Sequence, residues 1–366
     1  MAAGLGTRLL PLTRFSSKPM VPVLNRPVLE HLIKLLARHG VTELATNLHY
    51  QPDEIRRHFE CGSAFGVDLR YRLELDLSGT AGGTELFRTF LSDGTFLVMS
   101  GDALTDADLS ALLARHREHG GIATMAVKRI ADPSLYGVVV TDADGRVTGF
   151  QEKPAAAKAL SNLCNCGIYA FEPEIFRYIP SGRFVDYALD VFPALLADRR
   201  SFSVWQLDGY WSDVGSLDQY LGANSDALEG HVTLETPGEE VRRRVWLEPR
   251  AEVSPRAVLR APLLLGRGCR VAAGASLAGP LVLGDQCVVD ADAVVERSVL
   301  WAGCSVGAGA SIDGAIIGRR VRIGAGAVVS HGAVIADGCV VPDHAVVPGD
   351  ARLEPGTVAG AARARA

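Results

Sequence analysis

The chain has 366 residues, of which 48% are hydrophobic, enough to build two domains with substantial cores. Its net charge of −5 and pI of about 6.0, without a long basic run, argue against nucleic acid as a partner. No apolar stretch approaches the roughly 18 residues that a membrane-spanning helix needs. The seven cysteines lack the paired spacing of zinc or redox motifs, so we expect a reduced, cytoplasmic protein.

A segment rich in small residues opens the chain and reads MAAGLGTRLLPLT over residues 1–13. Small residues allow backbone amides to approach a polyphosphate, and basic side chains add positive charge. The segment is not a Walker loop, which needs Gly-Lys-Ser/Thr, and Leu9 stands where a dinucleotide fingerprint has its third glycine. The residues expected at the phosphates are Ala3, Gly4, Gly6, Thr7, Arg8 and Lys18.

This segment resembles the signature loop of nucleotidyltransferases that join a sugar-1-phosphate to a nucleoside triphosphate (NTP). The resemblance covers nearly all of residues 2–224 and implies a Rossmann-like, doubly wound mixed sheet with ligands at the carboxyl ends of its strands. In that family an apolar strand of about six residues runs directly into the loop. Because the sequence begins at Met1, the resemblance predicts that this first strand is missing and that the chain starts late or is truncated.

Up to Asn224, apolar strands alternate with helical segments. Residues 27–39 have the spacing of an amphipathic helix, and residues 44–48, 95–99 and 122–128 are candidate parallel strands. This alternation predicts a three-layer α/β domain over residues 1–224.

From Val245 onward, branched apolar residues recur every six residues, with two five-residue steps, and a small or apolar residue stands two positions before each. This hexapeptide pattern predicts a left-handed parallel β-helix over residues 245–366, after a charged linker at 225–244. Eighteen hexads at three per coil make six coils. Four cysteines fall on inward positions, where we expect them to fill the core.

Two aspartates are candidates for binding a metal ion. Asp102 follows an apolar strand, and Asp213 lies in GYWSDVG, which is similar to the Trp-x-Asp-x-Gly segment of the family. The resemblance implies that both ligate Mg²⁺, and carboxylates with phosphate oxygens and water suit that hard cation. The residues implied in catalysis are Arg8, Lys18 and Asp102. The reaction is an in-line attack on the α-phosphorus that expels pyrophosphate, without a covalent enzyme intermediate.

Three short motifs resemble the family's sugar-binding run in order and spacing: YGVV, FQEKP and NCGIY. The resemblance implies that Glu152 and Asn165 bind sugar hydroxyls and that Lys153 pairs with the sugar phosphate. Taken alone, Glu152 and Lys153 would be interpreted as a surface ion pair, which contributes little. The sugar-phosphate residues are Tyr136, Gly137, Glu152, Lys153 and Asn165.

Residues 77–83 (LSGTAGG) resemble the base-recognition loop, in which glycines let main-chain groups reach a base edge. Leu-Gly-Thr-Ala-Gly is common in guanylyl enzymes of the family, and residues 47–50 (NLHY) are similar to them too. Ser78 and Glu85 depart from the usual Leu and Lys. The resemblance predicts GDP-mannose synthesis from GTP and mannose-1-phosphate. Uridylyl-, adenylyl- and thymidylyltransferases acting on glucose-1-phosphate stay open. The nucleotide-binding residues here are Gly79, Gly82 and Gly83.

Two other classes of function are weighed. A non-catalytic, nucleotide-sugar-sensing subunit would typically lose basic or acidic site residues. Here all five are present: Arg8, Lys18, Asp102, Lys153 and Asp213. An acyltransferase on the β-helix would use a histidine such as His331 or His344, but no extended loop interrupts the coils. We therefore expect the β-helix to be a scaffold that mediates homo-oligomer formation.

Overall fold

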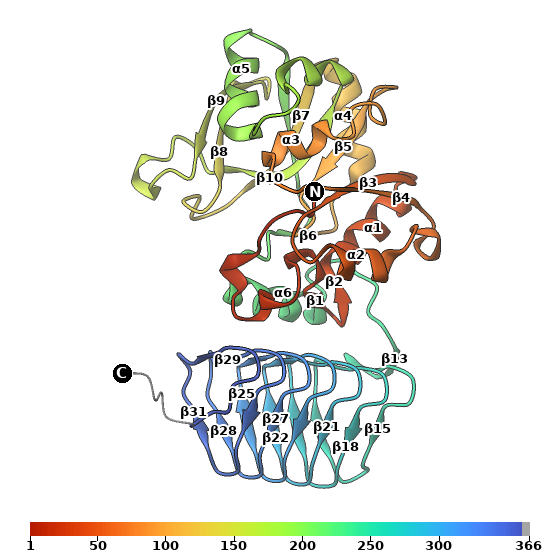
Figure 1. The fold of residues 1–366 in the computed structure, drawn as a ribbon, viewed down its shortest axis with the longest axis vertical. Helices are drawn as coiled ribbons and strands as arrows, with labels where there is room; N and C mark the ends of the chain where they lie inside the picture. Colours follow the sequence, from red (N-terminus) through yellow and green to blue (C-terminus); the bar gives the residue numbers. More distant parts are fainter. Residues whose placement is uncertain (361–366) are drawn as a thin grey trace. The chain divides into compact units, whose positions relative to one another are not determined.

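The computed structural model describes residues 1–360, which form two compact units (Figure 1). The first unit comprises residues 1–5, 17–20 and 28–213, and the second comprises residues 6–16, 21–27 and those from 214 onward. The N-terminal segment therefore contributes to both units. None of the helices in the described residues combines the length and apolarity needed to traverse a membrane.

The main sheet of the first unit has six strands: β5 (Phe96–Met99), β7 (Ala123–Arg129), β8 (Gly137–Thr141), β9 (Val147–Glu152), β10 (Leu163–Phe171) and β11 (Phe202–Gln206). Their order is β11-β7-β10-β8-β9, with β5 also paired to β10. β10 is antiparallel to β5, β7 and β8, whereas β7 and β11 are parallel. The predicted mixed sheet is confirmed, although β5 and β7 are joined through antiparallel β10 and do not pair with each other.

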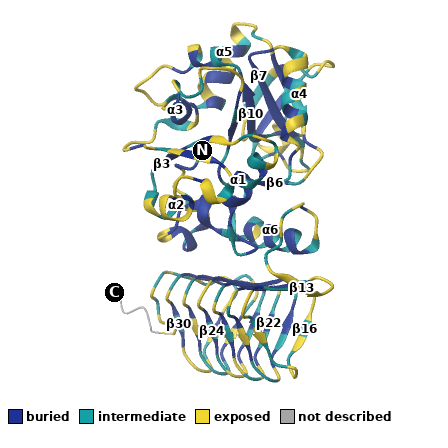
Figure 2. Ribbon diagram, turned by 90° about the vertical axis from the view of Figure 1, so that its right-hand side faces the viewer, coloured by how far each residue is buried: buried dark blue, intermediate teal, exposed yellow. Residues whose placement is uncertain are grey.

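Successive residues of β10 point into two different hydrophobic cores, because side chains alternate between the faces of a sheet. Tyr169 and Phe171 pack in the core that includes α5 (Phe192–Ala197). Ile168 belongs to the core that includes α4 (Leu109–His119) and α1 (Val28–Arg38). Figure 2 shows β7 and β10 buried between these layers. The predicted three-layer arrangement is thus present, and α1 matches the helix expected at 27–39.

A smaller sheet pairs β3 (Glu43–Leu48) in parallel with β4 (Asp68–Leu73). The connection between them carries α2 (Pro52–Phe59), whose buried residues Ile55 and Phe59 pack with the apolar face of this sheet. Because both strands run in the same direction, their carboxyl ends lie at the same edge. Asn47 of β3 and Glu74, which follows β4, lie at this edge.

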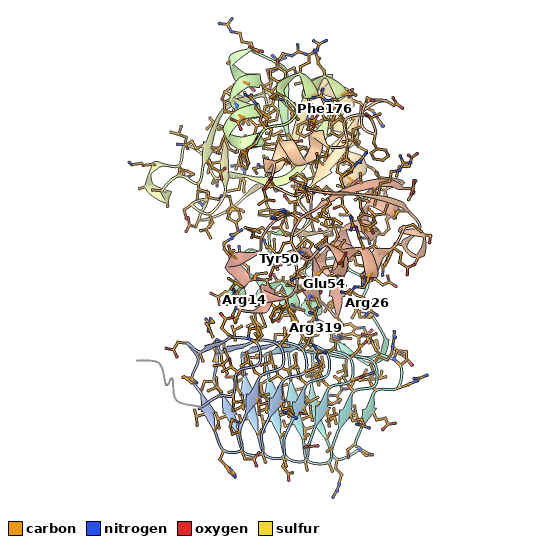
Figure 3. All side chains as sticks on the ribbon, viewed as in Figure 1. Arg14, Arg26, Tyr50, Glu54, Phe176 and Arg319 are labelled. Atoms are coloured by element: carbon orange, nitrogen blue, oxygen red, sulfur yellow. The ribbon has the colours of Figure 1, made fainter. Side chains whose placement is uncertain are left out.

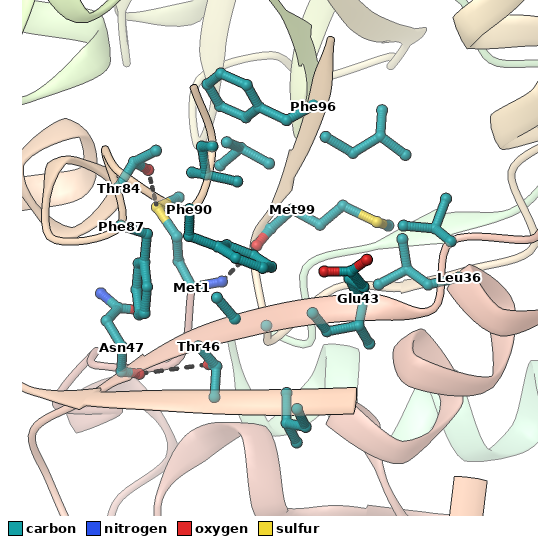
Figure 4. A pocket seen from close by; sticks show the side chains of 18 of the residues that line it. Met1, Leu36, Glu43, Thr46, Asn47, Thr84, Phe87, Phe90, Phe96 and Met99 are labelled. Atoms are coloured by element: carbon teal, nitrogen blue, oxygen red, sulfur yellow. Dashed lines mark hydrogen bonds between the residues drawn. The ribbon is translucent and has the colours of Figure 1, made fainter. Parts of the chain in front are cut away.

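A cavity of about 480 Å³ is lined by both β3 and β5 (Figure 4). Among the described residues, β3 pairs only with β4 and β5 only with β10, so one edge of each strand has no strand partner. The Met1 ammonium donates to Met99 O at 2.7 Å, and Gly101 N donates to Met1 O at 2.7 Å, which is the alternation of a parallel ladder. An extended segment continuing this ladder upstream of Met1 would run into the cavity.

The second unit is built on a parallel β-helix with three faces. The first face consists of β13 (Glu239–Arg242), β14 (Val245–Leu247), β17 (Leu263–Leu265), β20 (Leu281–Leu283), β23 (Val299–Leu300), β26 (Ile316–Ile317), β29 (Val334–Ile335) and β32 (Arg352–Leu353). The second consists of β15 (Glu252–Val253), β18 (Arg270–Val271), β21 (Val288–Val289), β24 (Ser305–Val306), β27 (Arg322–Ile323) and β30 (Val340–Val341). The third consists of β16 (Val258–Arg260), β19 (Ser276–Ala278), β22 (Val294–Glu296), β25 (Ser311–Asp313), β28 (Val328–Val329) and β31 (Val346–Val347).

The predicted six-residue period corresponds to one face of this helix. The two five-residue steps fall in consecutive coils, so the inward column through Leu283, Leu300 and Ile317 stays in register. The four inward cysteines are buried, and each thiol donates to a main-chain carbonyl, which confirms that they fill the core. These cysteines are Cys269, Cys287, Cys304 and Cys339.

The outward residues of the first face are also buried, because other parts of the second unit cover them. On α6 (Leu217–Glu229), the Tyr220 hydroxyl accepts from Trp301 Nε1 at 2.8 Å and donates to Pro22 O at 2.7 Å. Pro22 belongs to the hairpin of β1 (Pro22–Val23) and β2 (Arg26–Pro27). The same unit contains two further ion pairs, Arg26 with Glu248 and Arg14 with Glu354. The two arginines are labelled in Figure 3.

Part of the predicted linker at 225–244 has regular structure. α6 continues to Glu229, and β13 pairs antiparallel with β14 at the start of the β-helix. The domain boundaries at 224 and 245 stay a prediction, because the compact units group segments by contact and not by chain order.

Candidate active site

The ammonium group of Lys18 joins two of the predicted site residues. Its Nζ donates to Asp102 Oδ2 at 2.5 Å and to the main-chain oxygen of Asp213 at 2.9 Å. Asp102 lies between β5 and β6 (Leu104–Thr105), and Asp213 directly follows β12 (Trp211–Ser212), which pairs antiparallel with β6. The pairing of β6 with β12 therefore brings the two aspartates toward one ammonium. The Lys18 side chain is only 7% exposed, so solvent screens this ion pair weakly.

The donor set around Lys18 fits a divalent cation. Among residues 1–360, no cluster of three or more His, Cys, Asp or Glu side chains is arranged to hold a metal ion. Asp102 and Asp213 are the two acidic residues next to the Lys18 ammonium, and they would be the protein's ligands if a metal ion bound here. This suits Mg²⁺, which usually binds one or two carboxylates and completes its shell with substrate phosphates and water.

The predicted phosphate-binding residues are divided between the two compact units. Ala3, Gly4 and Lys18 belong to the first unit, and Thr7 and Arg8 to the second. Ala3 is buried, whereas Gly4 is exposed and has open space where a Cβ would stand.

Gly6, in the second unit, begins a compact turn over residues 6–9, the phosphate turn. Its φ of 65° is in the left-handed region that favours glycine, and it precedes a short 3₁₀ helix over Thr7–Leu9. The Gly6 carbonyl accepts from Leu9 N at 3.1 Å and from the Thr13 hydroxyl at 2.8 Å. The predicted loop is therefore an ordered turn with its own hydrogen bonds.

The predicted base-recognition segment is helical and is not an open loop. Helix α3 covers Gly79–Glu85, and the amides of Ala81 and Gly82 both donate to Val185 O at 3.0 Å. Val185 N in turn donates to Ser78 O at 2.8 Å. Val185 O therefore occupies two amides of this segment, and the role of the segment in base recognition stays a prediction.

The glycines of α3 are needed for close packing. A Cβ on Gly79 would collide with the main-chain oxygen of Val185, and one on Gly83 would collide with the Asn47 amide. Gly79 also has a φ of 84°, which strains any other residue. The three glycines thus allow α3 to approach its neighbours closely, whatever their role toward a base.

Glu85, which departs from the usual Lys of the family, does not carry an uncompensated charge. Its Oε1 accepts from Arg88 Nε at 3.2 Å and from the Ser181 hydroxyl at 2.5 Å. The side chain is 15% exposed. The acidic residue is therefore paired within its own part of the fold.

The predicted sugar-binding motifs meet on β8, β9 and β10. Gly137 of β8 is the register partner of Glu152 of β9, and a Cβ at Gly137 would crowd the Phe150 ring. Tyr136 packs edge-on against Trp211 at a centroid distance of 5.3 Å. Trp211 is 9% exposed and its Nε1 donates to Cys166 O at 2.8 Å, as a packing residue would.

Two of these residues have partners within the protein. Lys153, with a φ of 45°, pairs with Glu152 at 2.8 Å and is 61% exposed. The Asn165 amide donates to the Tyr169 hydroxyl at 2.8 Å and accepts from Gly167 N at 2.9 Å. A sugar would have to share or replace these contacts, so the roles of Glu152, Lys153 and Asn165 stay predictions.

The sequence patterns did not single out Glu74, a buried carboxylate next to the base-recognition segment. Its oxygens accept from Asn47 Nδ2 at 2.6 Å and from Ser78 N at 2.8 Å. Glu74 follows β4 and Asn47 lies in β3, so the shared carboxyl edge of this small sheet brings them together. In the sequence, Glu74 and Asp76 both alternate with leucines (LELDL), and nothing distinguishes the buried carboxylate from the exposed one.

Comparison with known proteins agrees with this arrangement. Residues 1–230 match the family model described as nucleotidyl transferase. The chain belongs to the nucleotidyl transferase family. Residues 242–347 match a model described as the EIF2B subunit epsilon LbH domain, a left-handed β-helix, which confirms the predicted handedness.

Relatives match over most of this nucleotidyl transferase chain. A UTP–glucose-1-phosphate uridylyltransferase from Synechocystis is 36% identical over 316 residues, covering 82% of this chain and 81% of the relative. A mannose-1-phosphate guanylyltransferase from Mycobacterium tuberculosis is 34% identical over 299 residues, covering 81% and 82%. A solved structure titled as a putative glucose-1-phosphate thymidylyltransferase from Bacillus anthracis shares the fold. Its TM-score is 0.58 at 23% identity, covering 64% of this chain and 95% of that one.

Proposed function

We propose that this chain transfers a nucleotidyl group from an NTP to a sugar-1-phosphate, giving an NDP-sugar and pyrophosphate. Its family membership and the names of its relatives support this reaction class. The observation that carries the proposal is the Lys18 ammonium held between the Asp102 carboxylate and the Asp213 main chain. A buried cation beside two acidic residues suits a reaction in which several phosphate charges must be neutralised.

In the proposed reaction, an oxygen of the sugar phosphate attacks the α-phosphorus of the NTP. A phosphorus–oxygen bond forms there while the bond to the β-phosphate breaks, and pyrophosphate leaves. Arg8 and Lys18 would bind the triphosphate, and the Asp102 ion pair keeps Lys18 oriented before substrate arrives. Asp102 and Asp213 would hold Mg²⁺, which when bound neutralises the phosphates and aligns them.

The remaining candidates divide between the two substrates. Glu152 and Asn165 would bind sugar hydroxyls, Lys153 would bind the sugar phosphate, and Tyr136 and Gly137 would shape that side of the site. The residues proposed to bind the nucleotide are Ala3, Gly4, Gly6, Thr7, Gly79, Gly82 and Gly83.

For the substrates, we propose GTP and mannose-1-phosphate. The names of several relatives support this, among them a mannose-1-phosphate guanylyltransferase catalytic subunit beta from Dictyostelium discoideum, 36% identical over 225 residues. UTP with glucose-1-phosphate is the second candidate, because the Synechocystis relative carries that name. A non-catalytic sensor is disfavoured, since Lys18, Asp102 and Asp213 are retained in contact.

We further propose that residues 245–366 are a scaffold for a homo-oligomer and that the protein acts in the cytoplasm. The described cysteines form no disulfide, which fits a reducing compartment.

A matrix of nucleoside triphosphates against sugar-1-phosphates tests the proposal, with pyrophosphate release as the measurement. We expect the highest kcat/KM for GTP with mannose-1-phosphate, and dependence on Mg²⁺. Higher kcat/KM for UTP with glucose-1-phosphate would select the second candidate. Absence of pyrophosphate release for every pair, in a folded sample that still binds nucleotide-sugar, would support the sensor.

A further inference from the structure

We propose that Glu74 is a positioning residue for the nucleotide, because its buried carboxylate links the segment that leads into the phosphate turn to the helix of the base-recognition motif. The proposal rests on the proposed function for its consequence, but the link itself is a feature of the fold. All of its members belong to the first compact unit.

Each oxygen of the Glu74 carboxylate has a different neighbour. Oε1 accepts from Asn47 Nδ2 at 2.6 Å, and Oε2 accepts from Ser78 N at 2.8 Å and from the Ser78 hydroxyl at 2.6 Å. Ser78 immediately precedes α3. The carboxylate therefore fixes the start of α3 relative to Asn47.

Asn47 passes the contact on to the N-terminal segment. Its Oδ1 accepts from Ala2 N at 2.9 Å, two residues before Gly4. Asn47 and Met1 are both among the residues that line the cavity (Figure 4). The orientation of the Asn47 amide follows from this geometry, because its nitrogen faces a carboxylate and its oxygen faces an N–H.

The burial of Glu74 is costly and is not explained by local packing. Glu74 is 5% exposed, while every other residue from Arg72 to Leu77 is exposed, including Leu75 at 84%. A buried carboxylate needs several hydrogen bonds to offset the loss of its hydration. The groups that donate to its carboxylate are neutral, so they offset this cost without the attraction of an ion pair. We infer that the main effect of these hydrogen bonds is to fix Asn47 and Ser78 in position.

The main chain of Glu74 is tied to the same sheet edge. Its N–H donates to Leu48 O at 2.8 Å, and its carbonyl accepts from His49 Nδ1 at 2.8 Å. Gly83 of α3 leaves the room that the Asn47–Glu74 pair requires, since a Cβ there would collide with the Asn47 amide and crowd the Glu74 carboxylate. The link thus joins β3, the end of β4, α3 and the N-terminal segment.

Glu74→Gln separates this role from charge alone. The introduced glutamine can still accept from Ser78, but it then presents an NH₂ group to the NH₂ group of Asn47. If Asn47 turns its amide over, the Ala2 N–H faces a donor. If the glutamine turns over instead, the Ser78 N–H faces a donor, so one end of the link is lost in either case. We expect KM for the NTP to rise about tenfold, a loss typical of one hydrogen bond to a charged group, and KM for the sugar-1-phosphate to stay within about twofold.

A double variant provides the rescue. In Asn47→Asp with Glu74→Gln, the carboxylate moves from residue 74 to residue 47, so that it accepts from the Ala2 N–H and from the amide of the introduced glutamine. We expect the KM of this double variant for the NTP to lie within about threefold of the wild-type value. Asn47→Asp alone places two carboxylates together, so it should have the highest KM for the NTP of the three variants. The matched control is Asp76→Asn, an exposed carboxylate on the same segment, and it should leave KM unchanged.

Hydrogen–deuterium exchange provides a readout that does not need activity. Glu74→Gln should increase exchange in peptides covering residues 1–5 and 78–83 together, and the double variant should reverse both. Equal changes in KM for both substrates, a fall in Tm with unchanged kinetics, or exchange confined to one peptide would each overturn the proposal. If the wild-type chain releases no pyrophosphate with any substrate pair, the proposed function fails while the exchange experiment still tests the link.

Discussion

Lys18 is held before any substrate binds, because one carboxylate and one main-chain oxygen accept from its ammonium. Such an ion pair orients the cation but also reduces the positive charge available to a phosphate. Asp102 and Asp213 would hold Mg²⁺, which would supply positive charge to the phosphates when bound. In the proposed site, the charge of these two aspartates is therefore expected to matter for turnover.

We expect Asp102→Asn and Asp213→Asn each to reduce kcat by at least about 100-fold while the fold survives. Each removes one charge from the proposed metal ligands, and a metal site usually provides several kcal/mol of transition-state stabilisation. The measurement is kcat at limiting and at saturating Mg²⁺, with the exposed Asp208→Asn as control. Near-wild-type turnover of either variant at limiting Mg²⁺ would contradict the assignment.

Lys153→Ala and Arg8→Ala should separate the two substrates. Lys153 is 61% exposed and its ion pair with Glu152 contributes little to stability, so its loss should mainly raise KM for the sugar-1-phosphate. Arg8 lies in the phosphate turn, so its loss should mainly raise KM for the NTP. The measurement is KM for each substrate in each variant. In each variant, KM for the affected substrate should rise about tenfold more than KM for the other substrate. The same defect toward both substrates in the two variants would refute the division.

The Met1 ammonium makes stability depend on pH. Burial lowers its pKa from the ordinary 8.0 to about 6. Between those values the unfolded chain binds a proton that the folded chain does not, so the free energy of unfolding rises from pH 6 to pH 8, by about 2–3 kcal/mol. We expect Tm to rise over this range, and acetylation of the terminus to flatten the dependence. An identical Tm profile with and without the acetyl group would rule this out.

At the scale of elements, β3 and β5 line a cavity of about 480 Å³ in the first unit. Both strands have one edge without a strand partner in the described residues, and most of the cavity lining is apolar. An extended segment that covers these strand edges and apolar side chains would stabilise the fold, because it would pair backbone groups and bury apolar surface. The Met1 ladder aims the chain into this space.

We expect about six apolar residues added before Met1 to raise Tm and turnover, since this is a typical strand length and would support the phosphate turn rigidly. Thermal unfolding and pyrophosphate release should be compared with a Gly/Ser extension of equal length, which cannot fill the cavity. If the apolar and Gly/Ser versions have equal Tm and equal turnover, the sheet gains nothing from a strand there.

At the scale of the whole chain, the β-helix covers apolar surface within the second unit. Its outward valines and leucines on the first face are buried, and Tyr220 of α6 shares hydrogen bonds with Trp301 and Pro22. The two histidines weighed as catalytic lie with their rings against glycines of the preceding coil, His331 against Gly314 and His344 against Gly326. That position suits a structural role.

Deleting residues 245–366 should therefore expose the surface of α6 that the β-helix covers, without removing any residue assigned to chemistry. We expect lower solubility or a changed oligomeric state, measured by light scattering. Acetyl transfer to a sugar amine by the full chain, abolished in His331→Ala or His344→Ala, would instead show that the β-helix is an enzyme.

By itself the sequence determined what depends on local pattern. The six-residue period specifies the coils, because inward side chains must recur at each face whatever the rest of the chain does. The alternation of strands and helices specified a layered α/β unit, and the motifs around Lys18, Asp102 and Asp213 identified residues that the structure brings into one contact.

Only the tertiary structure decided what depends on partners far apart in the chain. Nothing near Glu74 marks it as buried, because its partner Asn47 is 27 residues away on another strand. The residues predicted as the base-recognition loop form helix α3, and two of its amides donate to Val185, which lies far downstream in the chain. The N-terminal segment is divided between the two units, since residues 1–5 and 17–20 belong to the first and residues 6–16 and 21–27 to the second. Burial and long-range pairing follow from packing, which is non-local, so spacing along the chain does not reveal them.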